Sequence, residues 1–140
     1  MKKIVLLVFL ATFLSCKTTK NATSSALYQV LTEQPDGGAS IQFYEVLTEA
    51  KEIKMLLNDK NLKNKIHEND IKTCNFIILN SGYKNKGKNK IEIESIVEKE
   101  QTVEIKIKEN ATKTEVDLEQ ETVNPYLILK INSKKEIVFK

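Results

Sequence analysis

The chain has few of the side chains that enzymes most often use for catalysis. Its 140 residues include one histidine, His67, and two cysteines, Cys16 and Cys74. A metalloprotease helix would need a second histidine where Ile71 stands, and no serine or cysteine lies in a pattern resembling a nucleophile elbow. Glu68 and Asp70 lack the spacing and the glycine of a calcium loop, so we expect them to be solvated charges. The sequence therefore predicts no enzyme, no catalytic or metal site, no cofactor and no small-molecule substrate.

The chain also lacks a strong excess of charge. The formal net charge is +3, and subtracting Lys2 and Lys3, which fall in the predicted signal peptide, leaves about +1. A near-neutral chain has no dense basic field for phosphate binding, so we expect no nucleic-acid partner. The run KNKGKNK at 84–90 fits a basic patch, but lysine and asparagine are abundant along the whole chain, and composition explains the run equally well.

The first sixteen residues, MKKIVLLVFLATFLSC, have the pattern of a secretory signal and are too short to span a membrane as a mature helix. The ending FLSC resembles a bacterial lipobox, which predicts a signal peptide over 1–15 and a lipid-modified Cys16. Because Lys17 provides no retention or export signal that we identify, we expect an outer-membrane lipoprotein of the cell envelope, on the periplasmic face. The alternative is an ordinary signal peptide with an incidental cysteine.

The lipid modification would also decide the state of Cys74. With Cys16 acylated, Cys74 lies in the apolar run CNFIIL as a buried free thiol. Without acylation, a Cys16–Cys74 disulfide becomes possible.

Residues 17–25 contain no large apolar side chain, so we expect 16–25 to be the lipidated cysteine and a flexible tether. A single domain follows over 26–140. Ala50, Ile53, Leu56 and Leu57 recur at helical spacing, which predicts one amphipathic helix with Thr48 as its N-cap. Alternating or continuous apolar residues predict the following strands: 26–31, 39–46, 73–80, 91–97, 102–108, 125–131 and 136–140.

The order of these elements predicts how they pair. PDGG at 35–38 is turn chemistry, so a hairpin of 26–31 with 39–46 is the simplest arrangement. The apolar run 73–80 reads as a central strand, and 91–97 should pair with 102–108, with Ile91, Ile93 and Val97 on one face. Residues 109–122 read as a long exposed connection in which Val116 and Leu118 turn inward. The fold class is mostly β (α+β): an antiparallel sheet or small sandwich with one amphipathic helix.

Three segments resemble the C-terminal domain of the protease complex subunit PrcB family: 37–57, FIILNSGYKNKGKNKIEIESI at 76–96, and NPYLILKI at 124–131. In that family a glycine-rich loop enters an alternating strand, and a proline-tyrosine pair opens a late strand. Gly87 matches the first glycine of the loop, and Pro125 and Tyr126 match the pair. Lys86, Lys88 and Asn89 replace the family's threonine, second glycine and tyrosine.

The resemblance implies a lipid-anchored, non-enzymatic accessory subunit or modulator of a secreted or surface protease. Its partner would bind through the loop at 82–90 and the loop that leads to Asn124, because loops on a rigid sheet commonly carry binding residues. The candidate binding residues are Gly82, Asn85, Lys86, Gly87, Lys88, Asn89, Pro125 and Tyr126. The alternatives are that the glycines serve turns and Tyr126 packs on the sheet, or that a structural envelope lipoprotein adds its last strand to a partner's sheet.

Overall fold

The computed structural model describes residues 27–87, 90–108 and 121–140. Strands predominate, and the fold is mostly β with antiparallel sheets, as the sequence predicts. The elements, in chain order, are β1 (Tyr28–Gln34), β2 (Gln42–Leu47), α2 (Ala50–Asn58), α3 (Asp70–Thr73), β3 (Asn75–Ser81), β4 (Lys84–Asn85), β5 (Ile93–Glu98), β6 (Thr102–Ile107), β7 (Thr122–Val123), β8 (Tyr126–Ile131) and β9 (Glu136–Phe139).

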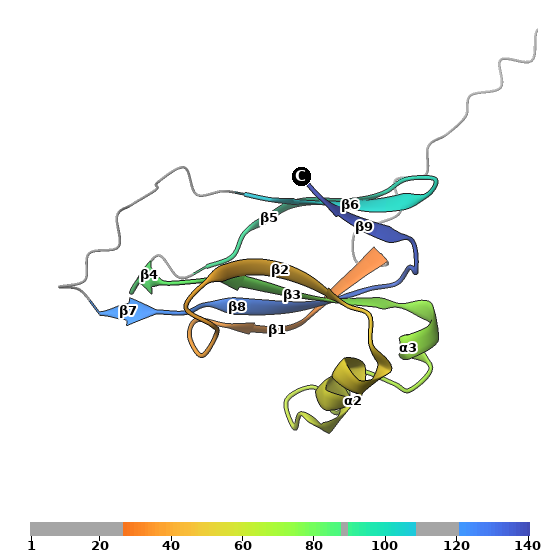
Figure 1. Ribbon diagram of the computed structural model, residues 1–140, viewed down its shortest axis with the longest axis horizontal. Coiled ribbons are helices and arrows are strands. Elements are labelled where there is room, and N and C mark those ends of the chain that lie inside the picture. The colour runs from red at the N-terminus through yellow and green to blue at the C-terminus, as the bar shows by residue number, and fades with distance from the viewer. Residues whose placement is uncertain (1–26, 88–89, 109–120) are drawn as a thin grey trace, which may run out of the picture.

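The strands form two stacked sheets and a short ribbon (Figure 1). The central sheet has the order β1-β8-β3-β2 with every pair antiparallel, and the outer sheet has the order β5-β6-β9. The ribbon is β4 paired with β7. One pairing departs from the antiparallel pattern, because β9 runs parallel to β6. The helices cover the face of the central sheet that is turned away from the outer sheet.

The predicted hairpin between the first two strands is wrong. β1 pairs with β8 and β2 pairs with β3, so β1 and β2 lie at opposite edges of the central sheet. Residues 35–41, which we call the crossing loop, therefore pass across the end of β8 and β3. Hydrogen bonds from these two strands and their flanking residues hold the loop there, and this explains why a local turn motif does not produce a local hairpin.

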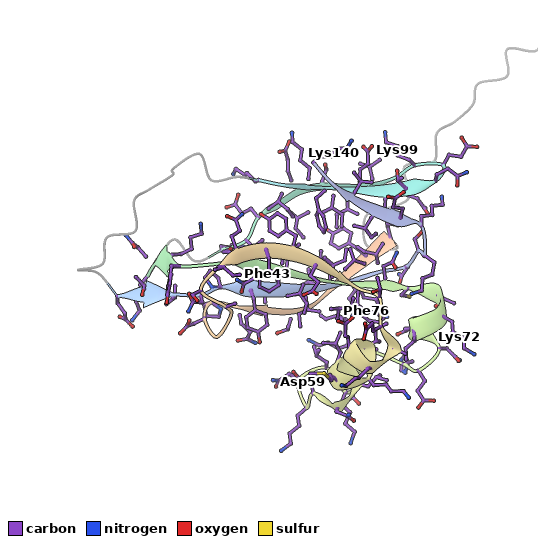
Figure 2. All side chains as sticks on the ribbon, viewed as in Figure 1. Phe43, Asp59, Lys72, Phe76, Lys99 and Lys140 are labelled. Carbon is purple, nitrogen blue, oxygen red and sulfur yellow. The ribbon has the colours of Figure 1, made fainter. Side chains whose placement is uncertain are left out.

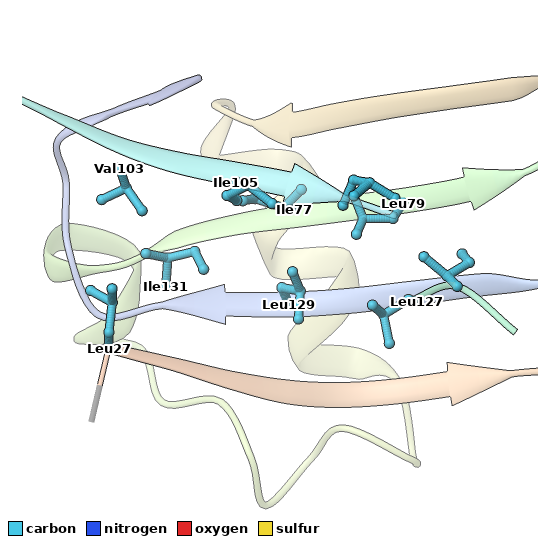
Figure 3. Close-up of a cluster of buried hydrophobic side chains, with 10 residues drawn as sticks. Leu27, Ile77, Leu79, Val103, Ile105, Leu127, Leu129 and Ile131 are labelled. Atoms are coloured by element: carbon cyan, nitrogen blue, oxygen red, sulfur yellow. The ribbon is translucent and has the colours of Figure 1, made fainter. Parts of the chain in front are cut away.

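A first apolar core fills the space between the two sheets (Figure 3). Alternation along β6 turns Val103, Ile105 and Ile107 into this core, as the sequence predicts. The central strands contribute a matching set: Ile77, Leu79, Leu127, Leu129 and Ile131. The run 73–80 is confirmed as a central strand, since β3 lies between β8 and β2 and is buried along most of its length.

The predicted face of β5 is wrong toward its end. A register irregularity between Ile93 and Ser95 shifts the alternation, so Ile96 packs against the first core and Val97 is 43% exposed. An extra residue in one strand of an antiparallel pair moves every later side chain to the other face. Pairing of β5 with β6 is confirmed.

A second core lies between the central sheet and the helices. Ile53 is buried, Leu56 and Leu57 pack beside it, and Phe76 of β3 lies opposite. The helix starts one residue later than predicted: Glu49 is the N-cap, and its backbone N–H donates to Oε2 of Glu52 at 3.1 Å. Glu52, the third residue of the helix, thus satisfies the backbone N–H of the N-cap residue.

The sequence did not predict the second, short helix, α3. His67 N–H donates to Oδ2 of Asp70 at 2.9 Å, and Lys130 Nζ lies 3.2 Å from the same oxygen. Asp70 is therefore not a solvated charge as predicted, because it joins α3 to β8 in a mostly buried ion pair, whereas Glu68 is exposed. Cys74, which follows α3, is buried and free, as predicted.

Candidate protein-binding end of the central sheet

Three segments that are far apart in the sequence meet where β3 ends and β8 begins. They are the crossing loop 35–41, the loop 82–87 and residues 121–126, and we call this region the loop end. Backbone hydrogen bonds join residues 121–126 to the other two segments and to the end of β3: Gly38 N donates to Asn124 O at 2.8 Å, Lys86 N to Glu121 O at 2.9 Å, and Ser81 N to Pro125 O at 3.1 Å. Figure 1 shows the ribbon β4–β7 extending from the same end.

Asn80 holds the crossing loop onto the central sheet. Its side chain is buried; Oδ1 accepts from Ala39 N at 2.9 Å, and Nδ2 donates to Ala39 O and to Ile41 O. The loop passes so close to it that a Cβ added to Gly38 would stand 2.2 Å from Asn80 Oδ1. The amide therefore replaces the backbone partners that a loop buried against a sheet would otherwise lack.

Asp36 fixes the crossing loop from its exposed side. Its Oδ1 accepts from Asn124 N at 2.8 Å. The backbone hydrogen bonds from Asn124 and Gly37 lower the pKa of this carboxyl below its ordinary value. Asp36 therefore remains ionised at neutral pH while it ties the crossing loop to the segment before β8.

The ribbon presents two different sides. Lys84 pairs with Val123, and Asn85 pairs with Thr122. Because successive side chains alternate along a strand, these two pairs lie on opposite faces of the ribbon. Lys86 forms an exposed ion pair with Glu121 at 2.7 Å, which is a weak contribution to stability. On the other face, within the described residues, the buried Oδ1 atoms of Asn85 and Asn124 have no hydrogen-bond partner.

Two large apolar side chains that the sequence did not mark as binding residues are exposed at the loop end. Ile41 is 70% exposed and Tyr83 is 49% exposed. Gly82 brings their backbones together, because a Cβ at Gly82 would lie 2.9 Å from Gln42 N and 3.1 Å from Ile41 C. Single exposed apolar side chains are common on any protein surface, but aromatic residues are enriched at protein-binding surfaces, so the two together make the loop end a candidate.

The structure brings the two predicted binding segments together but gives several of their residues supporting roles. Pro125 is buried, and Tyr126 is half-buried against the second core. Gly82 is buried at a positive φ of 68°, which a close turn requires. Gly87 is exposed at a φ of 94°, and none of the described residues lies within 4 Å of where a Cβ would stand. The predicted residues Lys88 and Asn89 lie outside the described residues.

The missed residues had partial signals in the sequence. Asn80 is a polar residue that ends an apolar run, and Asp36 precedes two glycines in a turn motif. Ile41 and Tyr83 gave no signal, because exposure of an apolar residue next to a strand depends on what packs beside it.

Two further expectations concern regions beyond this site. The predicted lipidation site Cys16 and the inward-turned Val116 and Leu118 lie outside the described residues. β9, the strand of the alternative hypothesis, is an edge strand of the outer sheet, and Lys140 N donates to Ile105 O at 3.0 Å where it ends. In the part of the chain that the structure describes, no group of histidine, cysteine and acidic side chains could hold a metal ion.

Comparisons with known proteins add no relative. No protein-family model matches the chain, no curated protein matches it, and no solved structure matches it. No helix among the described residues has the length and apolar character needed to cross a membrane.

Proposed function

We propose that this protein is a non-enzymatic, lipid-anchored envelope protein that binds a protein partner through the loop end. Following the resemblance to the PrcB family, the partner is a secreted or surface protease, and the chain acts as its accessory subunit or modulator. The lipid on Cys16 would anchor the protein in the outer membrane, on the periplasmic face. The domain itself then needs no contact with the bilayer, because buried acyl methylenes contribute about 0.8 kcal/mol each.

The observation that carries the proposal is the exposure of Ile41 and Tyr83 on a rigid frame. Asn80, Asp36 and the three backbone hydrogen bonds to residues 121–126 hold the backbone around these side chains. A frame that is ordered before binding loses less conformational freedom when the partner binds. The loop end is therefore better suited to binding than the outer face of the outer sheet, where Glu92, Glu94 and their lysine partners form exposed ion pairs.

The test is capture of partners from the cell's own envelope fraction by the tagged full chain. The variant Ile41→Ser/Tyr83→Ser should lose a protease that the wild type captures. Its control is Met55→Ser/Val97→Ser, which removes two apolar side chains of similar exposure from α2 and β5. Capture that survives in the loop-end variant, or that is lost equally in the control, contradicts the proposed site.

Replacing residues 86–90 with glycine and serine tests the adjacent loop that the resemblance identifies. Loss of capture in this variant would extend the interface to that loop.

Two single-substitution strains test the remaining parts of the proposal. Cys16→Ala should leave the protein soluble or unprocessed, and His67→Ala should leave the phenotype unchanged if the chain is not an enzyme.

The second candidate function is a structural envelope lipoprotein that adds a strand to a partner's sheet. Its supporting observation is that β9 is an edge strand of the outer sheet. Against it stand the short length of β9 and the lysine that follows it, which are common protections of an edge. Capture of a non-protease partner that is unaffected by the loop-end variant would favour this candidate.

A further inference from the structure

The two sheets have four edges, and three of them carry features that discourage a further strand. β1 is interrupted by a register shift between Val30 and Thr32, and Lys65 Nζ donates to the carbonyl oxygen of Leu31. β5 has a similar irregularity. β9 has four residues and is followed directly by Lys140. Bulges, lysines and short length are the usual protections of an edge strand.

β2 is the exception among these edges. Its six residues pair with β3 in continuous register from Gln42 to Leu47. Glu45 is its one charged residue, and no proline interrupts it. No backbone hydrogen bond outside the ladder with β3 joins β2 to the rest of the described chain.

The direction of the free backbone groups follows from the hydrogen-bond pattern. Ser81 N donates to Pro125 O, so Ser81 and every second residue before it in β3 face β8. Asn80, Ile78 and Phe76 therefore face β2, where their partners are Phe43, Glu45 and Leu47. The N–H and C=O groups of the remaining β2 residues point away from the sheet, and these residues are Gln42, Tyr44 and Val46.

We propose that the open edge of β2 binds an extended segment of the partner protein, which adds to the central sheet as a fifth strand. The inference rests on the proposed function, because Gln42 directly follows Ile41 and the edge thus continues from the loop end. A second copy of the chain is a poorer occupant. Two six-residue edges alone would bury far less than the roughly 1,200 Å² of a stable complex, and pairing centred on Glu45 would oppose two like charges.

The side chains of β2 define the segment that fits. Glu45 is exposed on one face of the strand, so a lysine or arginine opposite it is favoured. Phe43 on the same face and Tyr44 on the other are half-buried, so apolar or β-branched residues fit beside them. The ligand is therefore an extended peptide with alternating β-branched residues and a basic residue near its centre.

The probe is a synthetic peptide of roughly nine residues that alternates threonine and valine around one central lysine. Amide hydrogen exchange of the isotopically labelled full chain is measured by NMR with and without this peptide. We expect exchange at Gln42, Tyr44 and Val46 to slow by at least about tenfold at saturation, with no change at Val30 of the β1 edge. Unchanged exchange at the three β2 amides, or equal slowing at Val30, overturns the proposal.

Charge reversal provides a matched pair of variants. Glu45→Lys should weaken binding of the peptide by about tenfold, whereas Glu33→Lys, an exposed glutamate on the protected β1 edge, should not change it. Equal affinity of both variants overturns the assigned edge.

Capture from the envelope fraction separates this proposal from the proposed function. If Glu45→Lys captures the partner as well as the wild type does while Ile41→Ser/Tyr83→Ser loses it, the edge proposal fails and the loop end stands. If the loop-end variant keeps the partner and Glu45→Lys loses it, the proposed site fails and the edge stands.

Discussion

The two ends of the central sheet are covered on the same face by different means. At the helix end, Phe76 packs with Ile53 and the other apolar side chains of the second core. At the loop end, the crossing loop lies over Asn80 and is held by hydrogen bonds to that amide and to Asn124. Close-packed apolar contacts tolerate little change, because removing even a small side-chain volume lowers the stability of the fold. A loop held by a few directional bonds leaves neighbouring side chains exposed, and this is why the candidate binding surface lies at the loop end.

The largest effect should come from truncating the helix end. Phe76→Ala removes a fully buried ring between β3 and α2 (Figure 2), and should lower the free energy of unfolding by about 3 to 5 kcal/mol. Its counterpart Phe43→Ala, near the loop end of β2, removes a half-buried ring and should cost about 1 kcal/mol. Urea denaturation followed by circular dichroism measures both. Equal losses would show that the two ends do not differ as described.

A smaller effect is expected from removing the amide that holds the crossing loop. Asn80→Ala leaves Ala39 N, Ala39 O and Ile41 O without their partner, which should cost about 2 to 3 kcal/mol. Asn75→Ala is the matched control at the other end of β3, where Nδ2 donates to Lys135 O and to no other described residue, and should cost about 1 kcal/mol. Hydrogen exchange at Ala39 should also accelerate in Asn80→Ala alone. Unchanged exchange at Ala39 would mean that other contacts hold the loop.

The smallest effect concerns one carboxylate at each end. Burial raises the pKa of Asp70, but the hydrogen bonds from His67 N–H and Lys130 outweigh it, so the net shift is downward; the pKa of Asp36 is lowered by backbone N–H groups. A lowered folded-state pKa contributes stability that is present above the ordinary value of 3.8 and is lost as the pH falls through the folded-state value.

We therefore expect the urea concentration at the unfolding midpoint to decrease once the pH drops below about 4. The Asp70→Asn variant should show a weaker pH dependence of this midpoint than the Asp36→Asn variant does. The reason is that Asp70 lies in a mostly buried ion pair, whereas Asp36 is exposed and its interactions are screened by solvent. A steeper acid dependence in Asp70→Asn than in the wild type would contradict the assigned role of the ion pair.

The candidate site was accessible from the sequence only in part. Glycines at 82 and 87 and the Pro125-Tyr126 pair marked the correct segments, because turns leave residue-type signals. The side chains that face solvent there, Ile41 and Tyr83, were missed. Pro125 and Tyr126 proved to support the site from within the sheet. Their roles depend on the crossing loop, whose path is set by contacts with Asn80 and Asn124, which lie 41 positions after Ala39 and 86 positions after Gly38 along the chain.

By itself the sequence determined the fold class, the buried faces of β3 and β6, and the apolar face of α2, because these follow from the periods of two and 3.6 residues. Only the tertiary structure decided that β1 and β2 lie at opposite edges, that β9 runs parallel to β6, and that a bulge turns Val97 outward. Strand order, direction and register are decided by which apolar surfaces fit together and by hydrogen bonds between distant residues. Local periodicity does not contain that information.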